Sequence, residues 1–294
     1  MKRVLIIGGD SMIGAALAGN LESHGHHVAQ TTRRQSPLSE AIYLDLGASP
    51  DTWPAFPKAD TWVLTAAISR LAACKDDPKG SHRINVGAVE HLAARADTNG
   101  VHLIYLSSDK VFDGSIPQRQ TADAVCPMSE YGRQKAEAEK IVAAKTGNGL
   151  VIRLTKVLAP SDTLFRTWRA ALLAGRKIEA FTDKTLAPLS SHAAADGIRR
   201  AIETSLCGVH HFSGPDDVTY FEAAQQLARL IGASADQVIP VRAVDRDVPA
   251  EDCPPFTSLD TGETCTALDL AFDPLDRVLE QFNRLGESPI NSNS

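Results

Sequence analysis

The chain has 294 residues, of which 43% are hydrophobic and 22% are charged, and this composition is typical of a globular protein with a sizeable core. Its formal net charge of −6 gives no general attraction to nucleic acid or to an anionic membrane, so we expect neither as a partner. The five cysteines are scattered and form no CxxC pair, which favours reduced thiols in a cytoplasmic protein over a disulfide framework.

The first half of the chain alternates short apolar strands with helical segments. Helices are predicted over about 12–24, over a long stretch that ends at 97–100, and over 131–140. The predicted strands are 3–8, 27–32, 41–46, 60–67, 101–108 and 149–155. Strands separated by helical crossovers predict an α/β fold with a Rossmann-type, doubly wound parallel sheet.

The alternation becomes less regular after about residue 160. Helical segments near 162–175, 192–204 and 219–232 are interleaved with short strands such as 177–181 and 208–212. We therefore expect a cofactor-binding Rossmann domain at 1–160 and a smaller α/β substrate lobe at 161–284. Segments near 185–212 are expected to return to the first domain, and residues 285–294 are expected to form a flexible tail.

A glycine-containing turn, IGGDSMIG (7–14), follows the first strand. Gly8 and Gly14 occupy the first and last positions of a dinucleotide-binding turn of the GxxGxxG type, and Ser11 occupies the middle position. Glycine allows the tight bend and the close helix packing, and the helix N-terminus attracts a pyrophosphate. Ser11 could add a hydroxyl to the phosphate. A plain turn that binds nothing is the alternative, but the place of the motif after the first strand favours cofactor binding.

The second strand ends in QTTRR (30–34), and no acidic residue follows until Glu40. Enzymes that prefer the unphosphorylated cofactor usually carry a carboxylate here, whereas a guanidinium matches a 2′-phosphate. Arg33 and Arg34 therefore predict NADPH, with NADH as the alternative cofactor. Two solvated loop arginines are the competing interpretation. Asp45, at the end of the third strand, is expected either to accept from the adenine amine or to cap the strand end.

Tyr131 and Lys135 lie one helical turn apart in YGRQKAEAEK (131–140). About two dozen residues earlier, the strand 101–108 ends in Ser107 and Ser108. Ligands bind at the carboxyl ends of the strands in a doubly wound sheet, so a phenol on the first turn of the next helix could reach the same crevice. Together with the glycine turn, this combination favours an active site over a solvated helix face.

These motifs resemble the extended short-chain dehydrogenase/reductase superfamily and, within it, the dTDP-4-dehydrorhamnose reductases. LSSDKVFDG (106–114) is similar to that family's segment with the catalytic serine or threonine, and YGRQKAEAE (131–139) to its tyrosine–lysine helix. RINVGAVEHLA (83–93) resembles its asparagine-bearing helix. A weaker likeness, in GVHHFSGPDDVTYFEAAQQLA (208–228), extends the resemblance to about residue 235.

The resemblance implies an NAD(P)-dependent oxidoreductase that reduces a keto-deoxysugar linked to a nucleotide. Tyr131 would donate a proton to the carbonyl oxygen, Lys135 would lower the phenol pKa and hold the nicotinamide ribose, and Ser108 would hydrogen-bond the same oxygen. The further expected cofactor contacts are Met12, Ile13, Leu46, Ala66 and Ala67. The expected substrate contacts are Asp109, Lys110, Val111, Phe112 and Arg153.

Several alternatives stay open. Lys110 stands where the family commonly has tyrosine, which puts the sugar pocket in doubt. Arg153 could contact substrate phosphates or pair with a carboxylate, and the structural pair is slightly favoured. The rival functions are an epimerase or dehydratase of the same superfamily and a regulatory subunit that binds the cofactor without turnover. The oligomeric state is open, with a homodimer as one alternative. No metal site is expected, because His210 and His211 project to opposite faces of a strand.

Overall fold

The structure, a computed structural model, describes residues 1–34 and 41–286. Its centre is a seven-stranded parallel sheet with the order β11-β6-β5-β4-β1-β2-β3. The predicted doubly wound parallel sheet is therefore confirmed. The strands are β1 (Arg3–Ile7), β2 (His27–Thr32), β3 (Ile42–Tyr43), β4 (Thr61–Leu64), β5 (His102–Ser108), β6 (Leu150–Leu154) and β11 (Gly208–Phe212).

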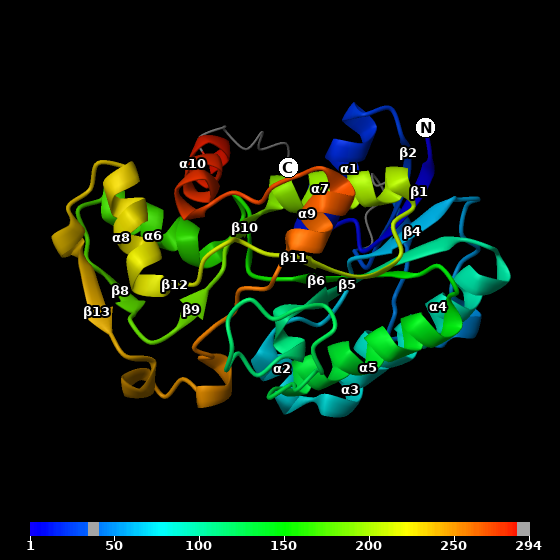
Figure 1. Ribbon diagram of the computed structural model, residues 1–294, viewed down its shortest axis with the longest axis horizontal. Helices are drawn as coiled ribbons and strands as arrows, with labels where there is room; N and C mark the ends of the chain where they lie inside the picture. The colour runs from blue at the N-terminus through cyan, green and yellow to red at the C-terminus, as the bar shows by residue number, and fades with distance from the viewer. Residues whose placement is uncertain (35–40, 287–294) are drawn as a thin grey trace.

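Helices cover both faces of this sheet (Figure 1). One face carries α1 (Met12–Ser23) and α7 (Ser191–Thr204), and the other carries α4 (Ala88–Thr98) and α5 (Glu130–Lys145). Three shorter helical segments, α2 (Leu71–Asp76), α3 (Pro78–His82) and a π-helical turn at Arg83–Gly87, lead into α4.

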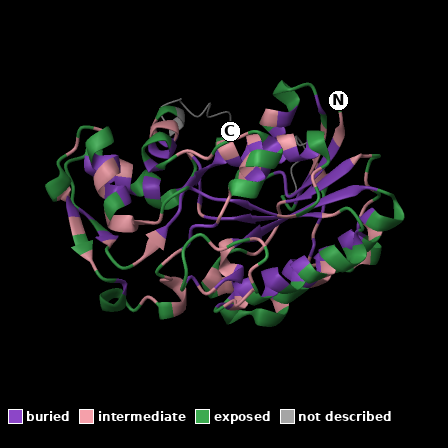
Figure 2. Cartoon of the chain, viewed as in Figure 1, coloured by how far each residue is buried: buried purple, intermediate pink, exposed green. Residues whose placement is uncertain are grey.

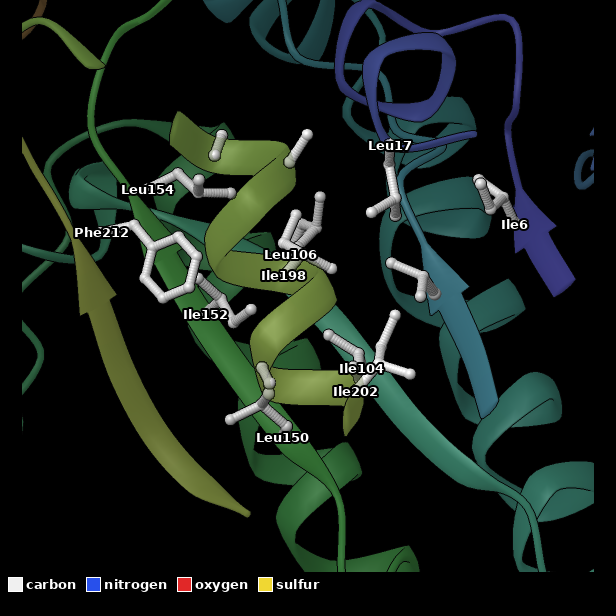
Figure 3. Close-up of a cluster of buried hydrophobic side chains, with 14 of the residues drawn as sticks. Ile6, Leu17, Ile104, Leu106, Leu150, Ile152, Leu154, Ile198, Ile202 and Phe212 are labelled. Carbon is white, nitrogen blue, oxygen red and sulfur yellow. The ribbon is translucent and has the colours of Figure 1, made fainter. Parts of the chain in front are cut away.

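The two cores follow from the alternation of side chains along each strand. In β1, Val4 and Ile6 face α1 and α7, whereas Leu5 and Ile7 face α4. Figure 3 shows the first of these cores, in which Ile198 of α7 packs against the side chains of the central strands. The central strands are consequently buried on both sides, whereas the outward faces of the helices and many of the loops are exposed in this view (Figure 2).

The second lobe lies beside the carboxyl ends of the strands (Figure 1). It contains α6 (Thr163–Leu173), α8 (Tyr220–Leu230) and α10 (Leu275–Gly286), which pack around a core that includes Phe165 and Phe282. Two strand pairs complete it: β8 (Ile178–Phe181) with β13 (Val238–Val241), which are parallel, and β9 (Thr185–Leu186) with β12 (Val218–Thr219), which are antiparallel. A short parallel pair, β7 (Val157–Leu158) and β10 (Leu189–Ser190), joins the two lobes.

The chain crosses between the lobes more than once. α7 and β11 rejoin the large sheet, in the region where a return near 185–212 was predicted. A second return was not predicted: α9 (Gly262–Leu268) packs against α7 and β11, and its Leu268 enters the core of the large sheet. Residues 285 and 286 end α10, and the rest of the tail expected at 285–294 lies outside the described residues, as does Glu40.

No helix in the described part of the chain is both long enough and apolar enough to cross a membrane.

Candidate active site

A pocket of about 750 Å³ opens at the carboxyl ends of β1, β2, β4, β5 and β6 and extends to the second lobe. This volume is within the range of pockets that hold small molecules, and the edge of the sheet is where doubly wound folds bind their ligands. Fourteen of the predicted site residues line it: Gly8, Ser11, Met12, Ile13, Arg33, Asp45, Leu46, Ala66, Ala67, Ser108, Asp109, Lys110, Tyr131 and Lys135.

The glycine turn between β1 and α1 forms the floor of the pocket. Gly8 has a φ of +100°, and a Cβ there would lie 2.7 Å from the backbone nitrogen of Ala66. A Cβ on Gly14 would lie 2.4 Å from the carbonyl oxygen of Gly8. Both positions therefore require glycine, one for its backbone angle and one for the close approach of α1 to the turn.

The Ser11 hydroxyl is engaged within this turn. It caps α1 by accepting from the amide of Gly14 at 3.0 Å, and it donates to the Thr65 hydroxyl at 3.0 Å. Thr65 in turn donates to the carbonyl of Gly8 at 2.7 Å. The amides of Met12 and Ile13, in the first helical turn, have no acceptor within the helix and are the natural donors to an anion.

The two predicted arginines at the end of β2 differ in their placement. Arg33 lines the pocket. Arg34 does not line it, and its largely exposed guanidinium lies 3.4 Å from the Asp10 carboxylate. Asp45 lines the pocket, but its carboxylate accepts from the amide of Gly47 at 2.9 Å, as a turn cap does. Of the two arginines, Arg33 is thus the better placed for a 2′-phosphate.

The loop after β4, which carries Ala66 and Ala67, is fixed from below by Asn85 in the π-helical turn. The Asn85 side chain accepts from the Ile68 amide and donates to the Ile68 carbonyl, both at 2.9 Å. It also donates to Gln134 of α5 at 2.8 Å. The amide therefore ties the pocket loop to the helix that carries Tyr131 and Lys135.

Ser108, at the end of β5, begins a short 3₁₀ turn at Asp109–Val111. Its hydroxyl donates to the Asp109 carboxylate at 2.9 Å and accepts from the Lys110 amide at 3.2 Å. The other oxygen of Asp109 lies 3.1 Å from the Lys110 ammonium. Lys110, which replaces the tyrosine common in the family, is therefore the ion-pair partner of Asp109, and Asp109 in turn accepts the hydrogen bond from Ser108.

Tyr131 and Lys135 are brought to the same pocket by the N-terminal turns of α5, which Ser129 caps. α5 lies very close to the turn after β5, since a Cβ on Gly132 would lie 2.0 Å from the Lys110 carbonyl oxygen. Lys135 is 3% exposed, and its ammonium donates to the Leu106 carbonyl at 2.8 Å and lies 5.6 Å from the centre of the Tyr131 ring.

Burial dominates the ionisation of both side chains. Burial, followed by the negative charge of Asp109, raises the pKa of Tyr131, and hydrogen bonding with Ser108 opposes this only in part. The net pKa of the phenol therefore stands above its ordinary value, and the lowering expected from Lys135 stays a prediction. Burial also lowers the pKa of Lys135 to about 8, against an opposing effect of Glu139. Below that pH the lysine is cationic and the tyrosine is protonated.

Three predicted substrate contacts lie outside the main pocket. Val111 and Phe112 turn inward after the 3₁₀ turn and pack in a small core with Ala136. Arg153 is 4% exposed and donates to both carboxylate oxygens of Glu139, at 2.8 Å from the nearer one. None of the three lines the main pocket as the structure describes it. For Arg153, the interpretation that the sequence slightly favoured, a pair with a carboxylate, agrees with this placement.

Several pocket residues were not predicted. Thr155 and Lys156 directly follow β6, so the rule that located Ser108 would also have located them. Lys184 and Tyr220 come from the second lobe, and no local motif marks them. The remaining unpredicted polar residues in the lining, apart from the loop after β4, are Asp10, Thr31, Thr32, Ser107, Thr185, Asp252 and Thr257.

The histidines do not form a metal site in the described part of the chain, where no cluster of three or more potential ligands occurs. His211 is fully buried, and burial together with Arg153 lowers its pKa to about 4. Its Nδ1 lies 3.1 Å from the carbonyl oxygen of Asp260, which ties β11 to the segment before α9.

The sequence matches the RmlD substrate binding domain family over residues 1–282. The chain belongs to this family. The resemblance to dTDP-4-dehydrorhamnose reductases, within the short-chain dehydrogenase/reductase superfamily, is thereby confirmed.

Relatives of this RmlD-family chain include proteins of two kinds. It is 27% identical over 270 residues to the dTDP-4-dehydrorhamnose reductase of Burkholderia thailandensis, which covers 84% of this chain and 87% of that protein. It is also 27% identical over 255 residues to methionine adenosyltransferase 2 subunit beta of Rattus norvegicus, an alignment that covers 82% of this chain and 75% of that protein. The dTDP-4-dehydrorhamnose reductase of Bacillus anthracis, solved in complex with NADP, has the same fold, with a TM-score of 0.83 and 18% sequence identity. The superposition covers 97% of this chain and 99% of that chain.

Proposed function

We propose that the protein is an NADPH-dependent reductase of a nucleotide-linked keto-deoxysugar. The observation that carries this proposal is the convergence of Ser108, Tyr131 and Lys135 on the pocket that the dinucleotide turn also lines. Hydride transfer to a carbonyl needs a cofactor and a proton donor at one place, and this pocket offers sites for both. The family relationship and the reductase of Burkholderia thailandensis support the same activity.

The cofactor half of the pocket fits a phosphorylated dinucleotide. The N-terminus of α1 favours an anion through its amides and its dipole, and Arg33 offers a guanidinium beside the end of β2. The fold neighbour from Bacillus anthracis was solved with NADP, which agrees with this choice. NADH is the alternative if Arg33 is solvated.

The chemical half of the pocket fits proton transfer to a reduced carbonyl. NADPH, when bound, supplies the hydride. Tyr131 is protonated at neutral pH, as an ordinary phenol is, and its raised pKa keeps it so at higher pH, which suits a group that must donate. A forming alkoxide is a stronger base than a phenolate, so the transfer from the Tyr131 oxygen is favourable.

Ser108 and Lys135 act on the same proton transfer. Ser108 acts to lower the pKa of Tyr131, and its hydroxyl could turn from Asp109 to the substrate oxygen. Lys135 is cationic below pH 8 and places a positive charge beside the phenolate that donation leaves behind. The two residues would thus stabilise the charge that develops on either side of the transferred proton.

The second lobe supplies the part of the pocket that fits a nucleotide-linked sugar. Lys110 and Lys156 are paired with Asp109 and Asp162 at 3.1 and 2.6 Å. Lys184 has no carboxylate partner among the described residues, and its ammonium lies 5.8 Å from the centre of the Tyr220 ring. An unpaired cation at the mouth between the lobes favours a substrate that carries phosphate.

The deciding experiment is oxidation of NADPH and of NADH by purified protein with a panel of nucleotide-linked keto-sugars. We expect NADPH to be oxidised with at least one 4-keto-6-deoxysugar nucleotide and to be preferred over NADH. Failure to oxidise either cofactor with any member of the panel would contradict the proposal. Stoichiometric retention of NAD⁺ through purification, with no net oxidation, would instead favour an epimerase or dehydratase.

A subunit role is the second candidate, because methionine adenosyltransferase 2 subunit beta is as similar in sequence as the reductase. The test is affinity purification of the chain from its native cells. A methionine adenosyltransferase recovered in fixed ratio, together with no keto-sugar-dependent oxidation of NADPH, would support this candidate over the reductase.

A further inference from the structure

Tyr105 of β5 lies beneath the proposed active site and has no assigned role. It is 1% exposed, and the Lys135 ammonium lies 4.6 Å from the centre of its ring. Its hydroxyl is buried and has no hydrogen-bond partner among the described residues. Burial raises the pKa of this phenol well above its ordinary value, so the hydroxyl stays neutral. The ring, and not the hydroxyl, is the part of Tyr105 that faces a functional group.

Lys135 needs such a neighbour, because little else stabilises its charge. Its one hydrogen bond among the described residues goes to the Leu106 carbonyl. The titratable groups that face it are Glu139 and Tyr131 on its own helix, Tyr105 on β5 and Cys74 on α2. Of these, the carboxylate of Glu139 exerts the strongest attraction on the ammonium.

That negative charge is largely committed elsewhere. Glu139 accepts from the Arg153 guanidinium with both of its oxygens, and one of them also accepts from the Ser107 hydroxyl. The Arg153 guanidinium therefore offsets part of the attraction that Glu139 exerts on Lys135. Besides that charge, two aromatic faces attract the ammonium, and Tyr105 at 4.6 Å lies nearer to it than Tyr131 at 5.6 Å.

We propose that the Tyr105 ring holds Lys135 in place and in its charged form, through a cation–π contact. An ammonium over an aromatic face is attracted most strongly where water is excluded, which is the case here. Tyr105 is thus a positioning residue that acts through Lys135 and touches neither substrate nor cofactor. Its effect on turnover rests on the proposed function, whereas its effect on Lys135 does not.

Two substitutions separate the ring from the hydroxyl. Tyr105→Phe keeps the ring and removes the unpartnered hydroxyl, whereas Tyr105→Leu removes the ring. The pKa of Lys135 is measured by NMR titration of protein labelled with ¹³C-lysine, and its signal is assigned by its loss in Lys135→Met. A cation–π contact favours the protonated form. We therefore expect Tyr105→Leu to lower this pKa by about one unit and Tyr105→Phe to leave it within a few tenths of the wild-type value.

The control is a second substitution that creates a cavity in the same core but removes no aromatic ring. Leu103 lies two residues earlier on β5, points to the same face and is fully buried. Leu103→Ala should lower Tm without moving the Lys135 pKa. An equal pKa shift in Leu103→Ala and Tyr105→Leu, an equal shift in Tyr105→Phe, or no shift in any variant would overturn the inference. If Tyr105→Leu does not fold, Tyr105→Met is measured in its place with the same expectations.

Turnover gives a second readout. If the protein reduces a keto-sugar, the alkaline limb of kcat/KM should move to lower pH in Tyr105→Leu and stay in place in Tyr105→Phe. A wild-type protein without reductase activity would refute the proposed function, and the NMR titration would still decide whether the Tyr105 ring acts on Lys135.

Discussion

At the scale of single residues, Tyr131 is the proposed proton donor, and its replacement gives the most direct test. Tyr131→Phe keeps the ring in the pocket and removes the only proton that the side chain can give. We expect kcat to fall by about 10²–10⁴-fold, the usual contribution of a positioned acid. NADPH affinity, measured by fluorescence titration, should change little. Turnover near the wild-type rate would refute the assignment of Tyr131 as the donor.

The lowered pKa of Lys135 leads us to expect that turnover and the free energy of unfolding change in opposite directions with pH. Its pKa is about 8 in the folded protein and 10.5 ordinarily, so between these values the unfolded chain binds a proton that the folded protein does not. The free energy of unfolding contributed by this group therefore rises with pH across that window, whereas turnover falls as pH rises through about 8. Denaturant titrations of wild type and Lys135→Met across the window isolate the first effect, and pH–rate profiles give the second. A rate independent of pH across it would contradict the proposed role of the lysine.

The sequence predicted the residues at strand ends better than those within strands. Ser108, Tyr131 and Lys135 could be brought together because parallel strands end at one edge, whatever their packing. Arg153 lies inside β6, between the apolar and buried residues Ile152 and Leu154. A strand that is buried on both faces shows no alternation of polar and apolar residues, so the sequence does not indicate which of its side chains face the pocket. The raised pKa of Tyr131 could not be predicted from the sequence either, because it depends on burial.

At the scale of elements, the turn into α1 can be tested by comparing two glycines of the same helix. A Cβ on Gly14 would lie 2.4 Å from the Gly8 carbonyl oxygen, whereas a Cβ on Gly19 has no neighbour within 4 Å. Gly14→Ala should destabilise the protein by about 1–3 kcal/mol and weaken NADPH binding. Gly19→Ala should stabilise it by up to about 1 kcal/mol and leave binding unchanged. Denaturant unfolding and NADPH titration check both, and similar behaviour of the two variants would show that α1 does not approach the turn so closely.

Elements set by local pattern were predicted, and those set by tertiary contacts were not. The strands and α5 follow from apolar runs and helical spacing. The π-helical turn at Arg83–Gly87 has no such signal, because the extra residue in the turn is favoured by the bonds that Asn85 makes to Ile68 and Gln134. The inward turn of Val111 and Phe112 likewise depends on the close approach of α5, which no local pattern reveals.

At the scale of the whole molecule, the pairing of β8 with β13 joins segments that are about sixty residues apart, and α9 returns to α7 across a similar gap. Such contacts are not encoded locally, so the sequence predicted a second lobe without its connections. The same holds for the pocket: Lys184 and Tyr220 face it only because β9 and β12 pair across the lobe. The substrate half of the site is therefore where prediction from sequence was weakest.

Lys184 offers a test of how the two lobes share one ligand. It lines the pocket from the second lobe, and its ammonium has no carboxylate partner in the described part of the chain, so a substrate phosphate would be its natural counterion. Loss of a charge-assisted hydrogen bond costs about 1.5–3 kcal/mol, so Lys184→Gln should raise KM for the nucleotide-linked sugar by about 10–100-fold and leave KM for NADPH unchanged. Lys177→Gln removes the same charge from an exposed position of the same lobe and should change neither constant. If Lys184→Gln and Lys177→Gln have the same KM for the sugar nucleotide, the phosphate is held elsewhere, and the second lobe contributes shape to the pocket without contributing charge to binding.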